Sequence, residues 1–166
     1  MATTNFLASF TATNNVPPST IFATLDTRNA HACLDFDGAT DEEAVFEAVL
    51  PNNYAGGGLT IDTYWSFTSA TTGSLRVQTS IERIDASTLD IDADSFATAN
   101  SAGGTAPGTS GMVIKVTTTH TSGAEMDSLV AGEAFRLKIR RDADGTSGTD
   151  DITTDAELLR TVIKET

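Results

Sequence analysis

Cysteine, long apolar runs and basic residues are scarce in this sequence, and each scarcity excludes a structural feature or a class of partner. Cys33 is the only cysteine, so no internal disulfide can form, and its apolar neighbours predict a buried rather than a reactive thiol. No apolar run reaches the roughly 18 residues of a membrane-spanning helix. The N-terminus also lacks the basic patch and apolar core of a secretory signal. We therefore expect no membrane partner.

The shortage of basic residues makes the chain strongly acidic. Its 166 residues include ten Lys and Arg against 23 Asp and Glu, which gives a formal net charge of −13. A surface this acidic repels phosphate backbones, so nucleic acid is not expected as a partner. The length is sufficient for one domain with a substantial core and short for two.

The residue patterns of common active sites are missing as well. His31 and His120 are the only histidines, and neither stands in a metal-ligand spacing. The sequence contains no Gly-x-Ser-x-Gly elbow and no phosphate-binding Gly-x-x-x-x-Gly-Lys loop. We therefore expect a protein that is not an enzyme, with no catalytic residue, no cofactor and no resident metal.

Two acidic stretches share features with calcium sites. The aspartates of residues 90–94 have the spacing with which a calcium loop begins, but Ser95 and Ser101 stand where the loop needs glycine and glutamate. A solvated strand edge is the simpler interpretation of this stretch. Residues 142–151 hold a second acidic cluster, and a loose calcium site made from its two turns stays open as an alternative.

Alternation of period two is the main pattern that the sequence does contain. Residues 59–68 place apolar side chains on one face and polar ones on the other, which is typical of a half-buried strand. Residues 75–83 and 112–120 show similar patterns, and residues 21–25 and 32–36 form two shorter extended runs around a turn.

Glycine-rich and proline-containing segments separate these runs. Residues 51–58 predict a rigid corner at which the chain changes sheets, and residues 97–111 predict a flexible surface loop. Trp65 is the only tryptophan, and we expect its ring to fill much of the core between two sheets.

Two segments carry a helical pattern instead. Residues 41–49 begin with a helix-like cap, and residues 155–164 have apolar residues at helical spacing. We nevertheless predict strands for both, because a sheet domain needs those edges filled and tertiary pairing often overrides local propensity. The expected fold is all-β, a two-sheet antiparallel β-sandwich of jelly-roll type over residues 21–166.

An extended N-terminal arm, residues 1–20, is expected to precede this single domain. Residues 1–25 contain no charged side chain, and Pro17 and Pro18 exclude a helix around them. A frayed terminus is the simpler interpretation of this segment. The alternative is an arm that lies along a neighbouring subunit and buries its phenylalanines there.

Residues 134–141 concentrate four of the ten basic side chains. Apolar and basic residues alternate in this segment, which predicts a strand with one apolar and one basic face. We expect the basic face to meet carboxylates, on a neighbouring strand or on another subunit. The candidates for contacts between subunits are Phe6, Phe10, Arg136, Lys138, Arg140 and Arg141.

Three motifs together carry a resemblance to a known family. Residues 49–60 read Val-Leu-Pro-Asn-Asn-Tyr-Ala-Gly-Gly-Gly-Leu-Thr and are followed by Tyr64-Trp65. Residues 124–133 precede the basic strand, and residues 155–159 read Asp-Ala-Glu-Leu-Leu. Over residues 21–165 this pattern resembles small jelly-roll virion structural proteins of tailed bacteriophages, of the capsid decoration or cement type.

The resemblance implies a function as well as a fold. It implies a protein made in the host cytoplasm that stabilises the outer surface of the phage capsid. Its expected partners are the major capsid protein and copies of itself, as a homotrimer. One alternative is a tail- or spike-associated host-recognition module, and a second is a small glycan-active enzyme.

Overall fold

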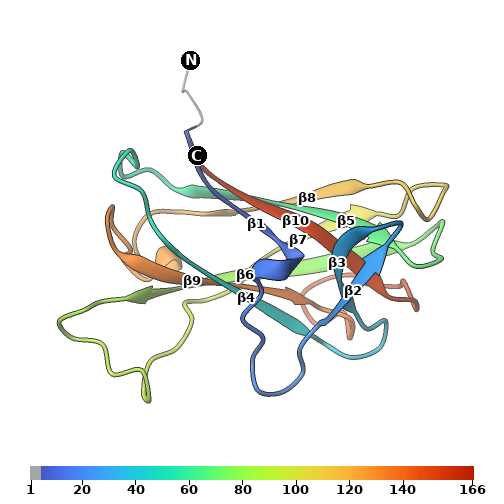
Figure 1. The fold of residues 1–166 in the computed structure, drawn as a ribbon, viewed down its shortest axis with the longest axis horizontal. Helices are drawn as coiled ribbons and strands as arrows, with labels where there is room; N and C mark the ends of the chain where they lie inside the picture. The colour runs from blue at the N-terminus through green and yellow to red at the C-terminus, as the bar shows by residue number, and fades with distance from the viewer. Residues whose placement is uncertain (1–4) are drawn as a thin grey trace.

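The computed structural model describes residues 5–166 as two antiparallel β-sheets packed face to face (Figure 1). Its elements are β1 (Phe6–Thr11), η1 (Ala12–Asn14), β2 (Thr24–Arg28), β3 (His31–Phe36), β4 (Glu43–Val49), β5 (Leu59–Phe67), β6 (Ser74–Ile84), β7 (Asn100–Thr105), β8 (Ile114–His120), η2 (Ala124–Met126), β9 (Ala134–Arg141) and β10 (Ala156–Glu165). Sheet A has the order β2-β3-β10-β5-β8, and β1 also pairs with β10. Sheet B has the order β4-β9-β6-β7.

Strands β3 to β10 follow jelly-roll connectivity. Four of them make the β3-β10-β5-β8 part of sheet A, and the other four make sheet B. The chain crosses from one sheet to the other at each connection between these strands except β6–β7, which pair within sheet B. This confirms the antiparallel sandwich of jelly-roll type, and it confirms residues 51–58 as a corner between sheets.

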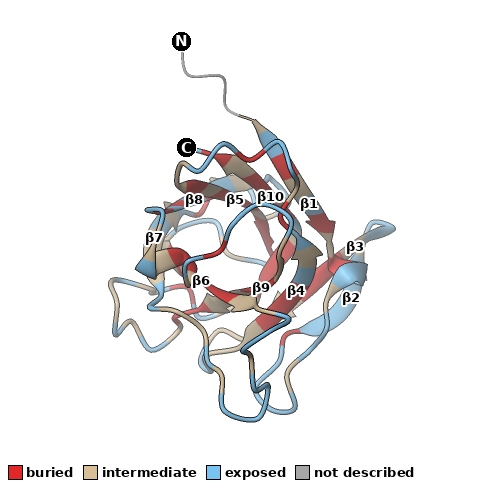
Figure 2. Cartoon of the chain, turned by 90° about the vertical axis from the view of Figure 1, so that its left-hand side faces the viewer, coloured by how far each residue is buried: buried red, intermediate tan, exposed pale blue. Residues whose placement is uncertain are grey.

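The core lies between the two sheets, and Figure 2 shows buried segments along the strands of both sheets. Trp65 is fully buried at its centre, as its sequence context predicts. Its ring meets that of Phe36 edge to face, with 5.1 Å between the ring centroids. The indole Nε1 donates a hydrogen bond of 2.7 Å to Thr63 Oγ1, so the polar end of this buried ring has a partner.

The two segments with a helical pattern are strands, which confirms the prediction for both. β4 pairs with β9 along its whole length, from Glu43 opposite Arg140 to Val49 opposite Ala134. β10 is a central strand with β5 on one side and β3 and β1 on the other. Strand pairing on both edges of β10, and on one edge of β4 with residues 16–23 along the other, satisfies backbone groups and outweighs a weak helical preference.

The expectation of a separate N-terminal arm is wrong for the residues that the structure describes. β1 pairs antiparallel with the chain's own β10, from Phe6 opposite Lys164 to Thr11 opposite Arg160. Residues 15–23 then follow β4, where the Val16 amide donates to the Val45 carbonyl at 2.8 Å. Leu7, Phe10 and Ala12 of this segment are buried against their own domain, whereas most of residues 13–22 are exposed. Residues 1–4 of the expected arm lie outside the described part of the chain.

Three other local expectations need correction. Residues 97–111 are not one loop, because they contain β7, which pairs with β6. The aspartates of residues 90–94 lie in turns after β6, not on a strand edge. The turn of the first hairpin was expected at residues 26–29, but it lies at Asn29 and Ala30, because residues 26–28 belong to β2. Both turn residues have left-handed backbone angles. Neither helix in residues 5–166 is long and apolar enough to cross a membrane.

Candidate functional site

A cleft of about 550 Å³ opens beside the first hairpin, within the 300–1,000 Å³ that is typical of ligand sites. We call it the hairpin cleft, and it is lined by Thr11, Arg28, Asn29, His31, Ala32, Ser66, Gly111, Val113, Leu159 and Arg160.

The pairing of β10 explains why a cleft forms at this place. One edge of β10 is shared by two short strands, with β3 opposite residues 156–158 and β1 opposite residues 160–164. Between these segments, the pairing of β10 with β5 shifts register around Leu159, as at a β-bulge. The cleft therefore lies at the junction of β1 and β3. The β2–β3 hairpin and the loop before β8 complete its walls.

The two arginines of the hairpin cleft differ in how many hydrogen bonds and ion pairs they form within the chain. Arg28 Nη1 donates to Glu157 Oε2 at 2.7 Å and to the Phe67 carbonyl oxygen. Its Nη2 makes one long contact of 3.5 Å with Ser110 Oγ. Arg160 is exposed, and within residues 5–166 its guanidinium has neither an ion pair nor a hydrogen bond.

Apolar atoms complete the lining. Ala32 and Leu159 are partly buried, and Val113 is 51% exposed at the edge of the cleft. A patch of this kind, bordered by a few hydrogen-bonding groups, suits a ligand that has both an apolar face and polar substituents.

Acidic groups lie close to the cleft but not in its lining. Burial, together with the charges of Asp26, Glu157 and Asp155, raises the pKa of Asp35 to about 6. Burial beside Asp35 also raises the pKa of the Cys33 thiol to about 12, so this thiol stays protonated. The prediction of a buried cysteine is confirmed.

A second cleft of about 360 Å³ follows β6 and has the opposite character. This acidic cleft is lined by Arg83, Asp85, Thr88, Leu89, Asp90, Ala93, Asp94 and Asp127. Arg83 is occupied by Glu133, to which its Nε donates at 2.7 Å, and Asp85 accepts from Thr88 Oγ1 at 2.6 Å. Much of the polar lining of the acidic cleft is therefore already hydrogen-bonded within the chain and stabilises the loop after β6.

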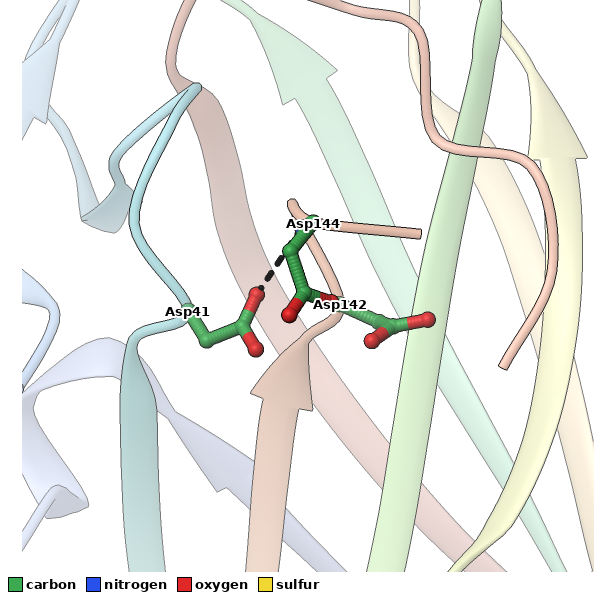
Figure 3. A group of neighbouring side chains, drawn as sticks. All are labelled: Asp41, Asp142 and Asp144. Atoms are coloured by element: carbon green, nitrogen blue, oxygen red, sulfur yellow. Dashed lines mark hydrogen bonds between the residues drawn. The ribbon is translucent and has the colours of Figure 1, made fainter. Parts of the chain in front are cut away.

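Three aspartates form a further cluster near the end of β9 (Figure 3). Asp41 precedes β4, whereas Asp142 and Asp144 follow β9, and one oxygen from each lies within 4.8 Å of the others. These oxygens already accept hydrogen bonds. Asp41 Oδ1 accepts from the Asp144 amide at 3.1 Å, the dashed line in Figure 3, and its Oδ2 pairs with Arg140.

Asp142 is likewise satisfied from within the chain. Burial would raise its pKa, but hydrogen bonds from Ser147 and Thr146 outweigh burial and hold the pKa below its usual range. Residues 142–151, for which a loose calcium site stayed open as an alternative, therefore form a hydrogen-bonded turn, and two of its aspartates, Asp142 and Asp144, approach Asp41.

The basic face of β9 meets carboxylates of neighbouring strands, the first of the two alternatives that the sequence allows. Arg136 lies between Glu47 of β4 and Glu82 of β6, and its Nη1 donates to Glu82 Oε2 at 2.8 Å. Lys138 Nζ is 3.3 Å from Glu43 Oε1 and 4.7 Å from the ring centroid of Phe96.

Arg140 and Arg141 complete this basic segment. Arg140 pairs with Asp41 and has its Nη1 3.4 Å from Gln78 Oε1. Arg141 is fully buried within the chain, where it binds Asp150 and three backbone carbonyl oxygens. Its expected role in contacts between subunits is therefore wrong, because its guanidinium does not reach the surface.

The two phenylalanines proposed for subunit contacts differ from each other. Phe10 is buried in the core of its own chain and stacks on Phe46 with 5.1 Å between ring centroids, so its expected interface role is also wrong. Phe6 is 59% exposed, and its role stays a prediction.

Sequence reasoning missed the hairpin cleft completely. Its residues come from five separate segments, and neither Arg28 nor Arg160 stands in a recognisable motif. The one usable signal was the turn near Asn29, because loops held on a rigid sheet often carry binding residues.

Comparison with known proteins gives a likeness of fold alone. No protein-family model and no curated protein matches the sequence. Among solved structures, CsCBM6-3 from Clostridium stercorarium, in complex with cellobiose, is similar with a TM-score of 0.56 and 7% identity, over 96% of this chain and 94% of that one. The C-terminal CBM6 of a laminarinase, LamC, from Zobellia galactanivorans has a TM-score of 0.54 and 11% identity, over 96% and 99%.

A third neighbour belongs to a different group of these modules. The xylan-binding domain CBM22-1 of Xyn10C from Paenibacillus barcinonensis has a TM-score of 0.54 and 10% identity, over 99% of this chain and 97% of that one. The likeness therefore extends over the whole sandwich, and each of these three neighbours is a carbohydrate-binding module.

Proposed function

We propose that this protein is a non-catalytic glycan-binding module whose ligand lies in the hairpin cleft. The observation that carries the proposal is the cleft itself, because its size and its mixed lining match a saccharide. A sugar ring has an apolar face of C–H groups and a rim of hydroxyls. The apolar atoms of Val113 and Leu159 suit the face, and Asn29 and His31 suit the hydroxyls.

The solved neighbours support the same function. They are carbohydrate-binding modules of the same sandwich architecture, and two of the similar structures contain cellobiose or cellotriose. The lining supports binding without turnover. Most glycoside hydrolases act with a pair of carboxylates that flank the scissile bond. No carboxylate is among the residues that line the hairpin cleft within the described chain.

This proposal develops the host-recognition alternative of the sequence analysis, since a module on a phage particle can recognise a host by its surface glycans. Capsid decoration, contact with a major capsid protein and trimer formation stay predictions from the resemblance. Retention of the purified protein on host cell envelopes favours host recognition, and retention on capsids alone favours decoration.

Titration of the isotopically labelled protein with an oligosaccharide panel tests the proposal. We expect chemical-shift changes that centre on the hairpin and on residues 111–113. Val113→Glu should abolish them by placing a charge in the apolar wall. Ile91→Glu is the matched control, because Ile91 is 81% exposed in a loop outside the hairpin cleft. Failure of every saccharide to bind, or equal binding by both variants, would overturn the proposal.

A further inference from the structure

Most basic side chains of this protein are already neutralised by its own carboxylates. Of the ten, Arg76 and Arg160 are the two that form no ion pair within residues 5–166. Arg76 has its Nη2 2.7 Å from Ser101 Oγ, whereas Arg160 has no hydrogen bond within the same residues. Arg160 is therefore the least engaged cation of the described chain, and it lies in the hairpin cleft.

Strand register explains why Arg160 is left without an anion. Across the ladder its neighbours are Thr11 of β1 and Tyr64 of β5, neither of which is a carboxylate. By contrast, Arg136 has a glutamate opposite it on both sides. Directly opposite residues on one face of a sheet are the ones that interact, so the register of β10 keeps this guanidinium available.

The second arginine of the cleft retains a donor as well. Arg28 Nη1 is committed to Glu157 and Phe67, but its Nη2 has only the 3.5 Å contact with Ser110. A side chain at Gly111 would begin 3.7 Å from that Nη2, so this glycine leaves open space beside the guanidinium. The cleft thus presents the unpaired guanidinium of Arg160 and one weakly engaged Nη2 of Arg28, whose charge is paired with Glu157, in a protein with 23 acidic residues.

We propose that the hairpin cleft recognises a sugar unit bearing a single carboxylate, a hexuronic acid within a saccharide that is otherwise weakly charged. This inference rests on the proposed glycan-binding function and specifies its ligand class. Arginine is suited to the role because its planar fork donates two parallel hydrogen bonds to a carboxylate.

The charge of the whole protein limits how acidic the ligand is. A net charge of −13 repels a polymer with a negative charge on every sugar, and this repulsion is long-ranged at low salt. A saccharide with isolated carboxylates escapes most of the repulsion and still satisfies Arg160. The structure therefore favours a sparsely substituted glycan over a densely charged one.

The test compares oligosaccharides that carry one glucuronic or galacturonic acid with the same oligosaccharides after reduction of the carboxyl to a hydroxymethyl group. We expect the acidic member of a pair to bind roughly tenfold or more tightly, which is the scale of a charge-assisted hydrogen bond. Arg160→Gln should abolish this preference, because it removes the charge that the carboxylate would meet. Arg76→Gln, which removes the other cation without an ion pair, is the matched control and should preserve the preference.

The outcomes separate this inference from the proposed function. Binding of acidic and reduced members with equal affinity would overturn the carboxylate preference and leave glycan binding intact. A preference that survives Arg160→Gln would overturn the assignment to this cleft. Binding of no member would overturn both proposals. A sulfated counterpart that binds more tightly than the carboxylate would overturn hexuronic acid as the ligand class.

Discussion

The basic face of β9 and the hairpin cleft place the same kind of side chain in opposite surroundings. On β9, Arg136, Lys138 and Arg140 each lie within 4 Å of a carboxylate oxygen, at distances that include 2.8 Å and 3.3 Å. In the cleft, Arg160 has no such partner within the described residues. A cluster of basic residues in the sequence therefore does not identify the cation that is available to a ligand.

The difference arises from strand register rather than from composition. Glu43 and Glu47 of β4 alternate in step with the basic residues of β9, so anions and cations meet across the sheet. β10 has no comparable acidic neighbour opposite Arg160. Exposed ion pairs contribute only about 0–1 kcal/mol each to stability. When one partner is buried, removal of the other partner costs more stability, because it leaves a buried charge unpaired. Variants that separate stability from binding can test this comparison.

The largest effect is expected at Arg141, the buried end of the basic segment. Arg141→Met should lower the free energy of unfolding by about 3–5 kcal/mol, because it leaves the buried Asp150 without its partner. It also removes the donor to the Phe36 and Thr154 carbonyl oxygens, at 3.2 and 2.8 Å. Urea unfolding of both proteins measures the change. Arg160→Met is the control and should be as stable as the parent, and equal stability of all three proteins would contradict the structural role of Arg141.

Arg136→Gln should produce the reverse of the Arg160→Gln phenotype. Burial raises the pKa of Glu82 even though Arg136 opposes this shift, so removal of Arg136 leaves a poorly solvated carboxylate. We expect a loss of about 2 kcal/mol at pH 8 and a smaller loss at acidic pH, where Glu82 is protonated in both proteins. Glycan affinity should not change. Loss of binding in this variant, with stability retained, would show that the two regions are not distinct.

The sequence predicted the fold far better than the site, and β9 and β10 show why. Alternation in residues 134–141 is a local property, so it identified a strand and its basic face correctly. β10 needed a global argument, because its helical spacing is outweighed only by pairing on both edges. The cleft depends on a register shift at Leu159 and on two arginines from distant strands, which no local pattern reveals.

Asp35→Asn tests the acidic groups that lie beside the hairpin cleft. The pKa of this carboxyl is about 6 in the folded protein and near 3.8 when unperturbed, so folding favours its protonated form. Stability should therefore fall as the pH rises from about 4 to 6, because the native state binds the proton more tightly than the unfolded chain. The amide cannot ionise, so we expect it to add about 1–2 kcal/mol at pH 8 and nothing below pH 4.

Thermal or urea unfolding at pH 4 and pH 8 measures this difference. Asp92→Asn is the control, because Asp92 lies exposed in the loop after β6 and should change stability by less than about 0.5 kcal/mol at both values. A gain at pH 4 as large as the gain at pH 8 would contradict an origin in ionisation. Retained glycan affinity would show that these acidic groups serve the fold of the hairpin rather than ligand recognition.

The smallest effect concerns the hairpin turn that holds Asn29 and His31 at the cleft. Ala30 has a φ of 64°, in a left-handed region that costs an L-residue about 1–2 kcal/mol and that glycine adopts freely. Ala30→Gly should therefore stabilise the protein by about 0.5–1 kcal/mol, even though glycine is more disordered in the unfolded chain. Ala86→Gly, at an exposed residue whose φ is not positive, should destabilise it instead. If Ala30→Gly also leaves glycan affinity unchanged, the strained turn only positions the hairpin, and the contrast between the two basic regions rests on Arg160.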